Sequence, residues 1–124
     1  IELSRVTGGH VHFAHISTRE AVGLIRKAKA EGLRISAEVT PHHLTLTDYN
    51  CVGYNGNFKM NPPLRSKEDQ AALIEALVDG TFDAVATDHA PHTPDEKTMA
   101  FDGCPNGVIG LETSLGVMLT RLVH

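Results

Sequence analysis

Several residue types and segment types are scarce in this sequence of 124 residues. Trp is absent and aromatic residues make up only 5% of the chain, so we expect a core of Val, Leu, Ile and Ala. The only cysteines, Cys51 and Cys104, lie in loop-like sequence, which excludes a disulfide scaffold and favours a reducing compartment. No apolar stretch approaches the roughly 20 residues of a membrane span, and no secretory signal is recognisable. These absences predict a cytoplasmic globular protein with no membrane partner.

The charge balance argues against another class of partner. Acidic residues outnumber basic ones by 15 to 11, giving a net charge of -4, and the basic residues form no stripe. We therefore expect no nucleic-acid partner. The sequence does contain eight histidines, scattered through separate segments. Such enrichment is typical of a metal site or an acid–base site.

Three successive units follow the order strand, loop, helix. The predicted strands cover 10–16, 34–39 and 83–87. The helices are predicted from a capping box at 17–20, from Ser66 to Gly80, and from a final apolar stripe at Leu111, Leu115, Met118 and Leu122. This alternation predicts a parallel α/β fold in one domain, 1–124. A closed barrel needs about 200 residues or more, so we expect this chain to be part of a larger protein.

The third predicted strand ends in an unusual run of polar residues. The apolar segment 82–87 is followed at once by Asp88, with His89, Pro91 and His92 close behind. Ligands of parallel α/β proteins bind at the carboxyl ends of the strands, where Asp88 would lie. A helix N-cap or a salt bridge at the strand end is the alternative role for this carboxylate. Asp88 is therefore a candidate functional residue.

His15 lies at the end of the first predicted strand. Strand alternation places Val11, Phe13 and His15 on one face, with His10 and His12 on the other. A lone histidine in such a place is more often a hydrogen-bonded core residue than a metal ligand. The residues alone leave both roles open.

Five segments of the chain, taken in order, carry a resemblance to a known family. They are HISTREAV, AEVTPHHLTLT, FKMNPPLR, ATDHAPH and GLETSL. The ordered set resembles dihydroorotases of the amidohydrolase superfamily, in the class found in many bacteria and in multifunctional pyrimidine-synthesis proteins. This resemblance implies a (β/α)8 TIM-type barrel, of which the chain would form the sixth to eighth strands with their helices. It also implies one or two Zn2+ ions per full-length subunit.

The resemblance assigns roles to individual residues. His15 and Asp88 match metal ligands, and Asp88 also matches the catalytic residue that shuttles the proton. Asn61 and His92 match residues that hold the substrate. Asn106 and Gly107 fall where the family offers backbone contacts to the substrate ring. The family more often has an aromatic residue at the position of Asn106, a change that a backbone contact tolerates.

The implied function is that of a zinc-dependent cyclic amidohydrolase. A dihydroorotase interconverts N-carbamoyl-L-aspartate and L-dihydroorotate in de novo pyrimidine (UMP) synthesis. One alternative is a hydantoinase, dihydropyrimidinase or allantoinase. Another is a non-catalytic homologue that acts as structural partner of aspartate carbamoyltransferase. The family pattern also implies a homo-oligomer. Because only two metal ligands are present by that pattern, we expect residues 1–124 alone to bind zinc weakly and to be inactive.

The remaining polar residues receive weaker assignments. The pair His10 and His12 imitates the first-strand His-x-His of amidohydrolases, but Ala14 stands where dihydroorotases have an arginine, so a metal role is not expected. Adjacent His42 and His43 are interpreted as packing residues, with a supporting role near the metal as the alternative. His89 is expected to point away from Asp88. Arg65 is either a loop residue in an ion pair or a neighbour of the substrate. Neither cysteine has a metal-binding spacing.

Overall fold

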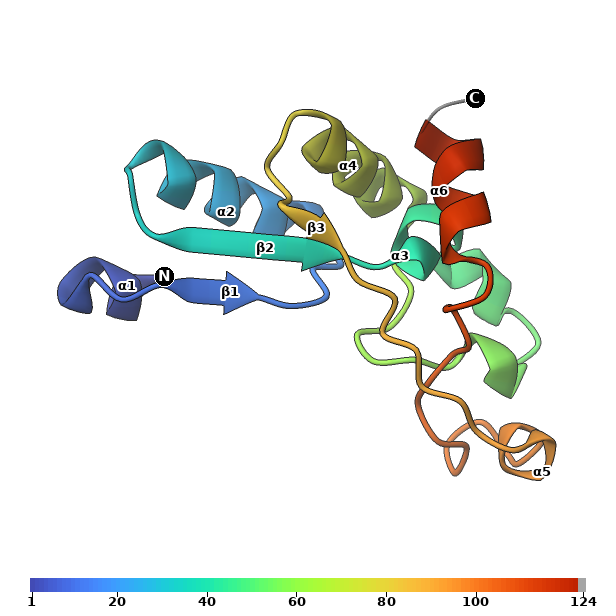
Figure 1. Ribbon diagram of the computed structural model, residues 1–124. Coiled ribbons are helices and arrows are strands. Elements are labelled where there is room, and N and C mark those ends of the chain that lie inside the picture. Colours follow the sequence, from blue (N-terminus) through green and yellow to red (C-terminus); the bar gives the residue numbers. More distant parts are fainter. Residues whose placement is uncertain (123–124) are drawn as a thin grey trace.

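A three-stranded parallel sheet with helices packed against it forms the centre of the computed structural model, which describes residues 1–122 (Figure 1). The strands are β1 (Val11–Phe13), β2 (Ile35–Val39) and β3 (Ala84–Val85). The helices are α1 (Glu2–Thr7), α2 (Arg19–Ala30), α3 (Pro41–Thr45), α4 (Lys67–Val78), α5 (Pro94–Lys97) and α6 (Ser114–Leu122), with 3-10 turns at Asp48–Cys51 and Gly56–Phe58. Within these residues, no helix has the length and apolar composition needed to cross a membrane.

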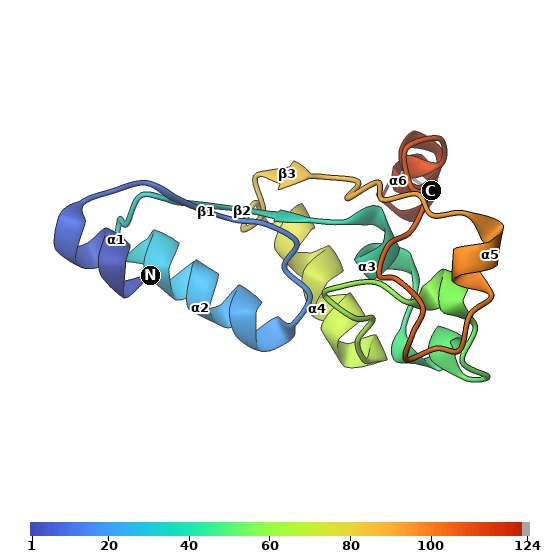
Figure 2. The ribbon, with the colours of Figure 1, turned by 90° about the horizontal axis from the view of Figure 1, so that it is seen from below.

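The strands lie in the order β1-β2-β3, with β2 in the centre. Val11 pairs with Ile35, and Val39 pairs with Val85, so the carboxyl ends of all three strands point the same way. Helices α2 and α4 lie side by side on one face of the sheet (Figure 2). The predicted parallel α/β arrangement is confirmed.

The hydrophobic core lies between β2 and the two helices on that face. Alternate residues of β2 are buried, while Ser36 and Glu38 face the opposite side of the sheet. The core consists of Val22, Ile25, Ala28, Ile35, Ala37, Val39, Leu44, Leu73, Ala76 and Phe82. All but Phe82 are aliphatic, as the scarcity of aromatic residues predicts.

Local sequence signals account for most helix ends. Ser66 accepts a hydrogen bond from the Asp69 amide at 3.2 Å, which makes it the predicted N-cap of α4. Gly32 adopts a left-handed conformation with φ of 75° just after α2, where a residue with a side chain is strained. The cap of α2 is one residue later than predicted: Thr18, rather than Ser17, accepts from the Ala21 amide.

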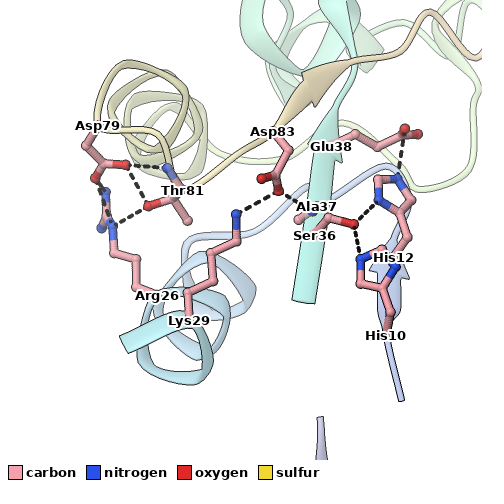
Figure 3. A network of polar contacts seen from close by, with 10 residues as sticks. All are labelled: His10, His12, Arg26, Lys29, Ser36, Ala37, Glu38, Asp79, Thr81 and Asp83. Carbon is pink, nitrogen blue, oxygen red and sulfur yellow. Dashed lines mark hydrogen bonds and ion pairs between the residues drawn. The ribbon is translucent and has the colours of Figure 1, made fainter. Parts of the chain in front are cut away.

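Polar contacts attach β3 to the rest of the fold (Figure 3). The Asp83 carboxylate accepts hydrogen bonds from Lys29 Nζ at 2.7 Å and from the Ala37 amide at 2.8 Å. These two bonds join the start of β3 to α2 and β2 at once. They orient β3 and therefore determine where the residues that follow it lie.

The last predicted helix differs most from its expectation. Helix α6 begins at Ser114, because residues 111–113 form a turn. Of its predicted apolar stripe, Met118 packs against the core, but Leu111 and Leu115 are exposed. The short helices α1, α3 and α5 have no counterpart among the predicted elements.

Candidate active site at the carboxyl ends of the strands

His15 and Asp88 lie beyond the ends of β1 and β3, and their side chains meet. The distance from His15 Nε2 to Asp88 Oδ1 is 3.7 Å. Both residues have left-handed backbones, with φ of 55° and 47°. Such conformations cost roughly 1–3 kcal/mol each and cluster at functional sites. The fold therefore holds the two predicted metal ligands together through strained backbone.

Glu38, near the end of β2, contacts two histidines. Its Oε1 lies 3.0 Å from His15 Nδ1. Its Oε2 forms a 3.0 Å hydrogen bond with His12 Nε2 (Figure 3). The contact to His15 is close, but its direction does not give His15 Nδ1 an aligned hydrogen bond. Sequence analysis missed Glu38. An acidic residue at the last outward position of a predicted strand was the available signal.

The position of His15 differs from the simple alternation prediction. His12 and His15 were expected on opposite faces of the strand, but both reach the same Glu38 carboxylate. The reason is that β1 ends at Phe13 and the left-handed backbone at His15 redirects its side chain. His12 Nδ1 and His10 Nε2 also share the Ser36 hydroxyl, at 2.8 and 2.9 Å.

His42 and His43 are buried at the start of α3. Thr40 Oγ1 lies 2.6 Å from His43 Nδ1, and His43 Nε2 donates to the Pro62 carbonyl at 3.0 Å. Because a carbonyl only accepts, the proton lies on Nε2, and Nδ1 accepts from the threonine hydroxyl. Burial lowers the pKa of His43, and burial together with neighbouring imidazoles lowers the pKa of His42 to about 3. His43 thus anchors the loop beside Asn61 as a neutral side chain.

Two other polar residues near the strand ends have structural contacts. His89 Nδ1 accepts hydrogen bonds from the amides of Gly110 and Leu111. Arg65 Nε donates to the hydroxyl of Ser17 at 3.3 Å. Arg65 therefore joins the segments that follow β1 and β2, while His89 joins two parts of the segment that follows β3.

Three of the predicted substrate residues, His92, Asn106 and Gly107, form one close group. The fourth, Asn61, lies outside this group. His92 Nε2 donates to the Asn106 carbonyl at 2.9 Å. A Cβ on Gly107, whose φ is 146°, would lie 2.5 Å from the Ala90 carbonyl oxygen, so glycine is required there. Asn61 is exposed, and its side chain has no hydrogen bond within residues 1–122.

A cleft of about 550 Å³ lies next to this group. His92, Lys97 and Gly107 are among its lining residues, whereas His15 and Asp88 are not. The cleft thus adjoins the predicted ring-binding backbone rather than the carboxylate at the end of β3.

The pair at the strand ends fits two of the ligands that zinc takes. Imidazole nitrogen and carboxylate oxygen bind zinc at about 2.0–2.2 Å. The 3.7 Å between His15 Nε2 and Asp88 Oδ1 is shorter than two such bonds end to end, so one ion can contact both. Among the described residues, no group of three or more His, Cys, Asp or Glu is placed to hold a metal. A complete site therefore needs further donors.

Sequence comparison finds close relatives along the whole chain. The dihydroorotase of Geobacillus sp. (strain WCH70) is 55% identical over 122 residues, which are 98% of this chain and 29% of that protein. The dihydroorotase of Caldanaerobacter subterraneus subsp. tengcongensis is 55% identical over 124 residues, again 29% of its length. No family model matches the chain. The chain thus spans about 29% of the length of the curated relatives that it matches.

Structural comparison finds hydantoinases and a dihydroorotase. The L-hydantoinase (dihydropyrimidinase) of Arthrobacter aurescens has a TM-score of 0.91 at 33% identity, covering 98% of this chain and 28% of that one. The dihydroorotase of Saccharomyces cerevisiae, in complex with 5-fluoroorotic acid, has a TM-score of 0.79 at 25% identity, covering 97% and 35%. The predicted partial (β/α) barrel is confirmed. The predicted resemblance is also confirmed, since over its whole length this chain is homologous to a segment of about 29% of a dihydroorotase.

Proposed function

We propose that residues 1–124 form the sixth to eighth strand–helix units of a dihydroorotase barrel. The reaction would be the interconversion of N-carbamoyl-L-aspartate and L-dihydroorotate, in cytoplasmic pyrimidine synthesis. The observation that carries this proposal is the meeting of His15 and Asp88 at 3.7 Å beyond two strand ends. The 55% identity between this chain and a dihydroorotase supports dihydroorotate as the substrate over the substrates of other members of the superfamily.

The Asp88 carboxylate is the group that moves the proton. When bound, zinc would polarise the amide carbonyl and lower the pKa of a water molecule toward about 7. In ring opening, Asp88 accepts the proton of the attacking water and returns it to the leaving ring nitrogen. In ring closure, the same carboxylate takes the proton from the attacking carbamoyl nitrogen and delivers it to the departing hydroxyl group, which leaves as water.

The other predicted site residues bind and orient the substrate. Asn61, whose side chain has no hydrogen bond among residues 1–122, would donate its amide N–H to the substrate carboxylate. His92 Nε2 donates to the Asn106 carbonyl, so His92 would act beside the backbone that contacts the substrate ring. The backbone of Asn106 and Gly107 would contact the ring, close to the cleft.

The experiment compares substrates in a full-length protein that carries residues 1–124 at their homologous positions. We expect a higher kcat/KM on dihydroorotate than on hydantoin or allantoin. Asp88→Asn should lower kcat by at least about a thousandfold while the protein stays folded. The matched control is Asp95→Asn, because Asp95 is exposed at the start of α5. Preference for hydantoin or allantoin would overturn the substrate assignment.

A hydantoinase is the second candidate, because hydantoinases have TM-scores of up to 0.92 with this chain. The same comparison of substrates separates the two candidates. A non-catalytic partner of aspartate carbamoyltransferase would be inactive on all three substrates. In such a homologue, Asp88→Asn would change the activity on none of these substrates.

A further inference from the structure

The ammonium group of Lys97 is the centre of a hydrogen-bond network beside the cleft. Lys97 Nζ donates to the carbonyl oxygens of Lys59 at 3.2 Å, Pro105 at 3.0 Å and Gly107 at 2.8 Å. An ammonium group has three N–H donors, so this set of carbonyls uses all of them. Lys97 thus has no free donor for a ligand, and among residues 1–122 its ammonium group hydrogen-bonds to backbone carbonyls alone.

The three carbonyls belong to the segments that carry the predicted substrate residues. Two of them stand on either side of Asn106, and the third belongs to Lys59, two residues before Asn61. The Gly107 amide also donates to the Lys59 carbonyl at 3.0 Å, so the two segments are joined directly as well. Lys97 therefore bridges loops that are far apart in sequence, at the point where both approach the site.

The backbone of Lys97 is held in place independently of its side chain. Helix α5 begins with a reciprocal capping box between Thr93 and Glu96. Gly56 lies so close to the Lys97 carbonyl that a Cβ there would overlap it. Because the backbone of Lys97 is fixed in this way, its ammonium group can hold the segments of Lys59 and Gly107 in place.

We propose that Lys97 is a positioning residue for the ring-binding backbone of Asn106 and Gly107. By attaching both flanking carbonyls to the segment before Asn61, it sets the distance between the two parts of the substrate site. It also presents the Asn106 carbonyl to His92. This inference rests on the proposed function, since it concerns how the same site is kept ready for substrate.

The test uses two variants of Lys97 in the full-length dihydroorotase that carries these residues. Lys97→Met keeps the length of the side chain and removes all three donors. We expect it to raise KM for dihydroorotate about tenfold, with kcat within about twofold, because hydrogen bonds from a charged group are lost. Lys97→Arg keeps the charge but has a planar fork of donors that cannot converge on three carbonyls. We expect Lys97→Arg to reverse less than half of the increase in KM that Lys97→Met causes.

A second measurement reports on the loop that carries Asn106 and Gly107, and it does not depend on enzymatic activity. Hydrogen exchange, followed by mass spectrometry, should be faster in the peptide covering 99–110 of Lys97→Met, and unchanged in helix α4. Lys67→Met, which alters an exposed lysine at the start of α4, is the matched control and should change neither quantity.

The possible failures are distinguishable. Complete recovery by Lys97→Arg would show that charge alone matters, and would overturn the positioning role. Unchanged exchange at 99–110, or an unchanged KM in Lys97→Met, would do the same. Absence of activity on dihydroorotate in the unmodified protein would instead refute the proposed function.

Discussion

Acidification should destabilise the 124-residue chain through His42 before the carboxylates titrate. His42 is only 6% exposed, and burial is the main reason that its pKa falls to about 3. Its Nε2 is buried without a hydrogen-bond partner in the described part of the chain. A proton added there would place a charge in surroundings that do not solvate it.

The sign and the size of this effect follow from the two pKa values. In the unfolded chain the His42 imidazole takes up a proton as the pH falls below about 6.5, while in the folded chain it stays neutral to about 3. The unfolded state therefore binds more protons in this range, and stability is full above about pH 6.5 and decreases below it. At about 1.4 kcal/mol per pH unit, the free energy of unfolding falls by about 2 kcal/mol between pH 6.5 and 5. The lowered pKa of His43 acts in the same direction.

Urea unfolding at pH 7.5 and pH 5.0 measures the effect. His42→Gln cannot take up a proton, so its free energy of unfolding should differ between the two pH values by about 2 kcal/mol less than that of the unmodified chain. Leu73→Ala is the control, because it removes core packing without a titratable group. Equal pH differences in the unmodified chain and His42→Gln would refute the reasoning.

Two further predictions concern the site and the core. Glu38→Gln should weaken zinc binding by the full-length protein about 10- to 100-fold, because the negative charge that lies 3.0 Å from His15 Nδ1 would be lost, and chelator competition would measure it. A change under about twofold would contradict that role. Leu73→Ala should lower the free energy of unfolding of the chain by about 2–5 kcal/mol, since Leu73 is 1% exposed in the core. A loss below about 1 kcal/mol would mean that the α4 core position is poorly packed.

Much of the scaffold is predictable because its signals are local. Ser66 and Gly32 mark helix ends through hydrogen bonding and backbone freedom that depend on a few neighbouring residues. The apolar run before Asp88 likewise marks a strand, although β3 is shorter than predicted, at Ala84–Val85, and is not fully buried. Such patterns need no knowledge of the rest of the molecule.

The contacts within the site depend on long-range geometry and were not predictable in detail. Alternation failed at His15 because the chain leaves the strand two residues earlier. Glu38 joins His12 and His15 only because parallel register places β2 beside β1. The acceptors of Lys97 are backbone carbonyls, which every residue has and which therefore leave no mark in the sequence.

The left-handed backbones of His15 and Asp88 limit what can replace these residues. Only Gly and a few short polar or ring side chains, chiefly Asn, Asp and His, adopt that conformation with any frequency. Alanine or a β-branched residue at either position would disturb the turn as well as remove the donor atom. Asparagine changes the chemistry and keeps the turn. In sequence libraries, tolerance at His15 and Asp88 should therefore follow backbone preference even under selection for folding alone.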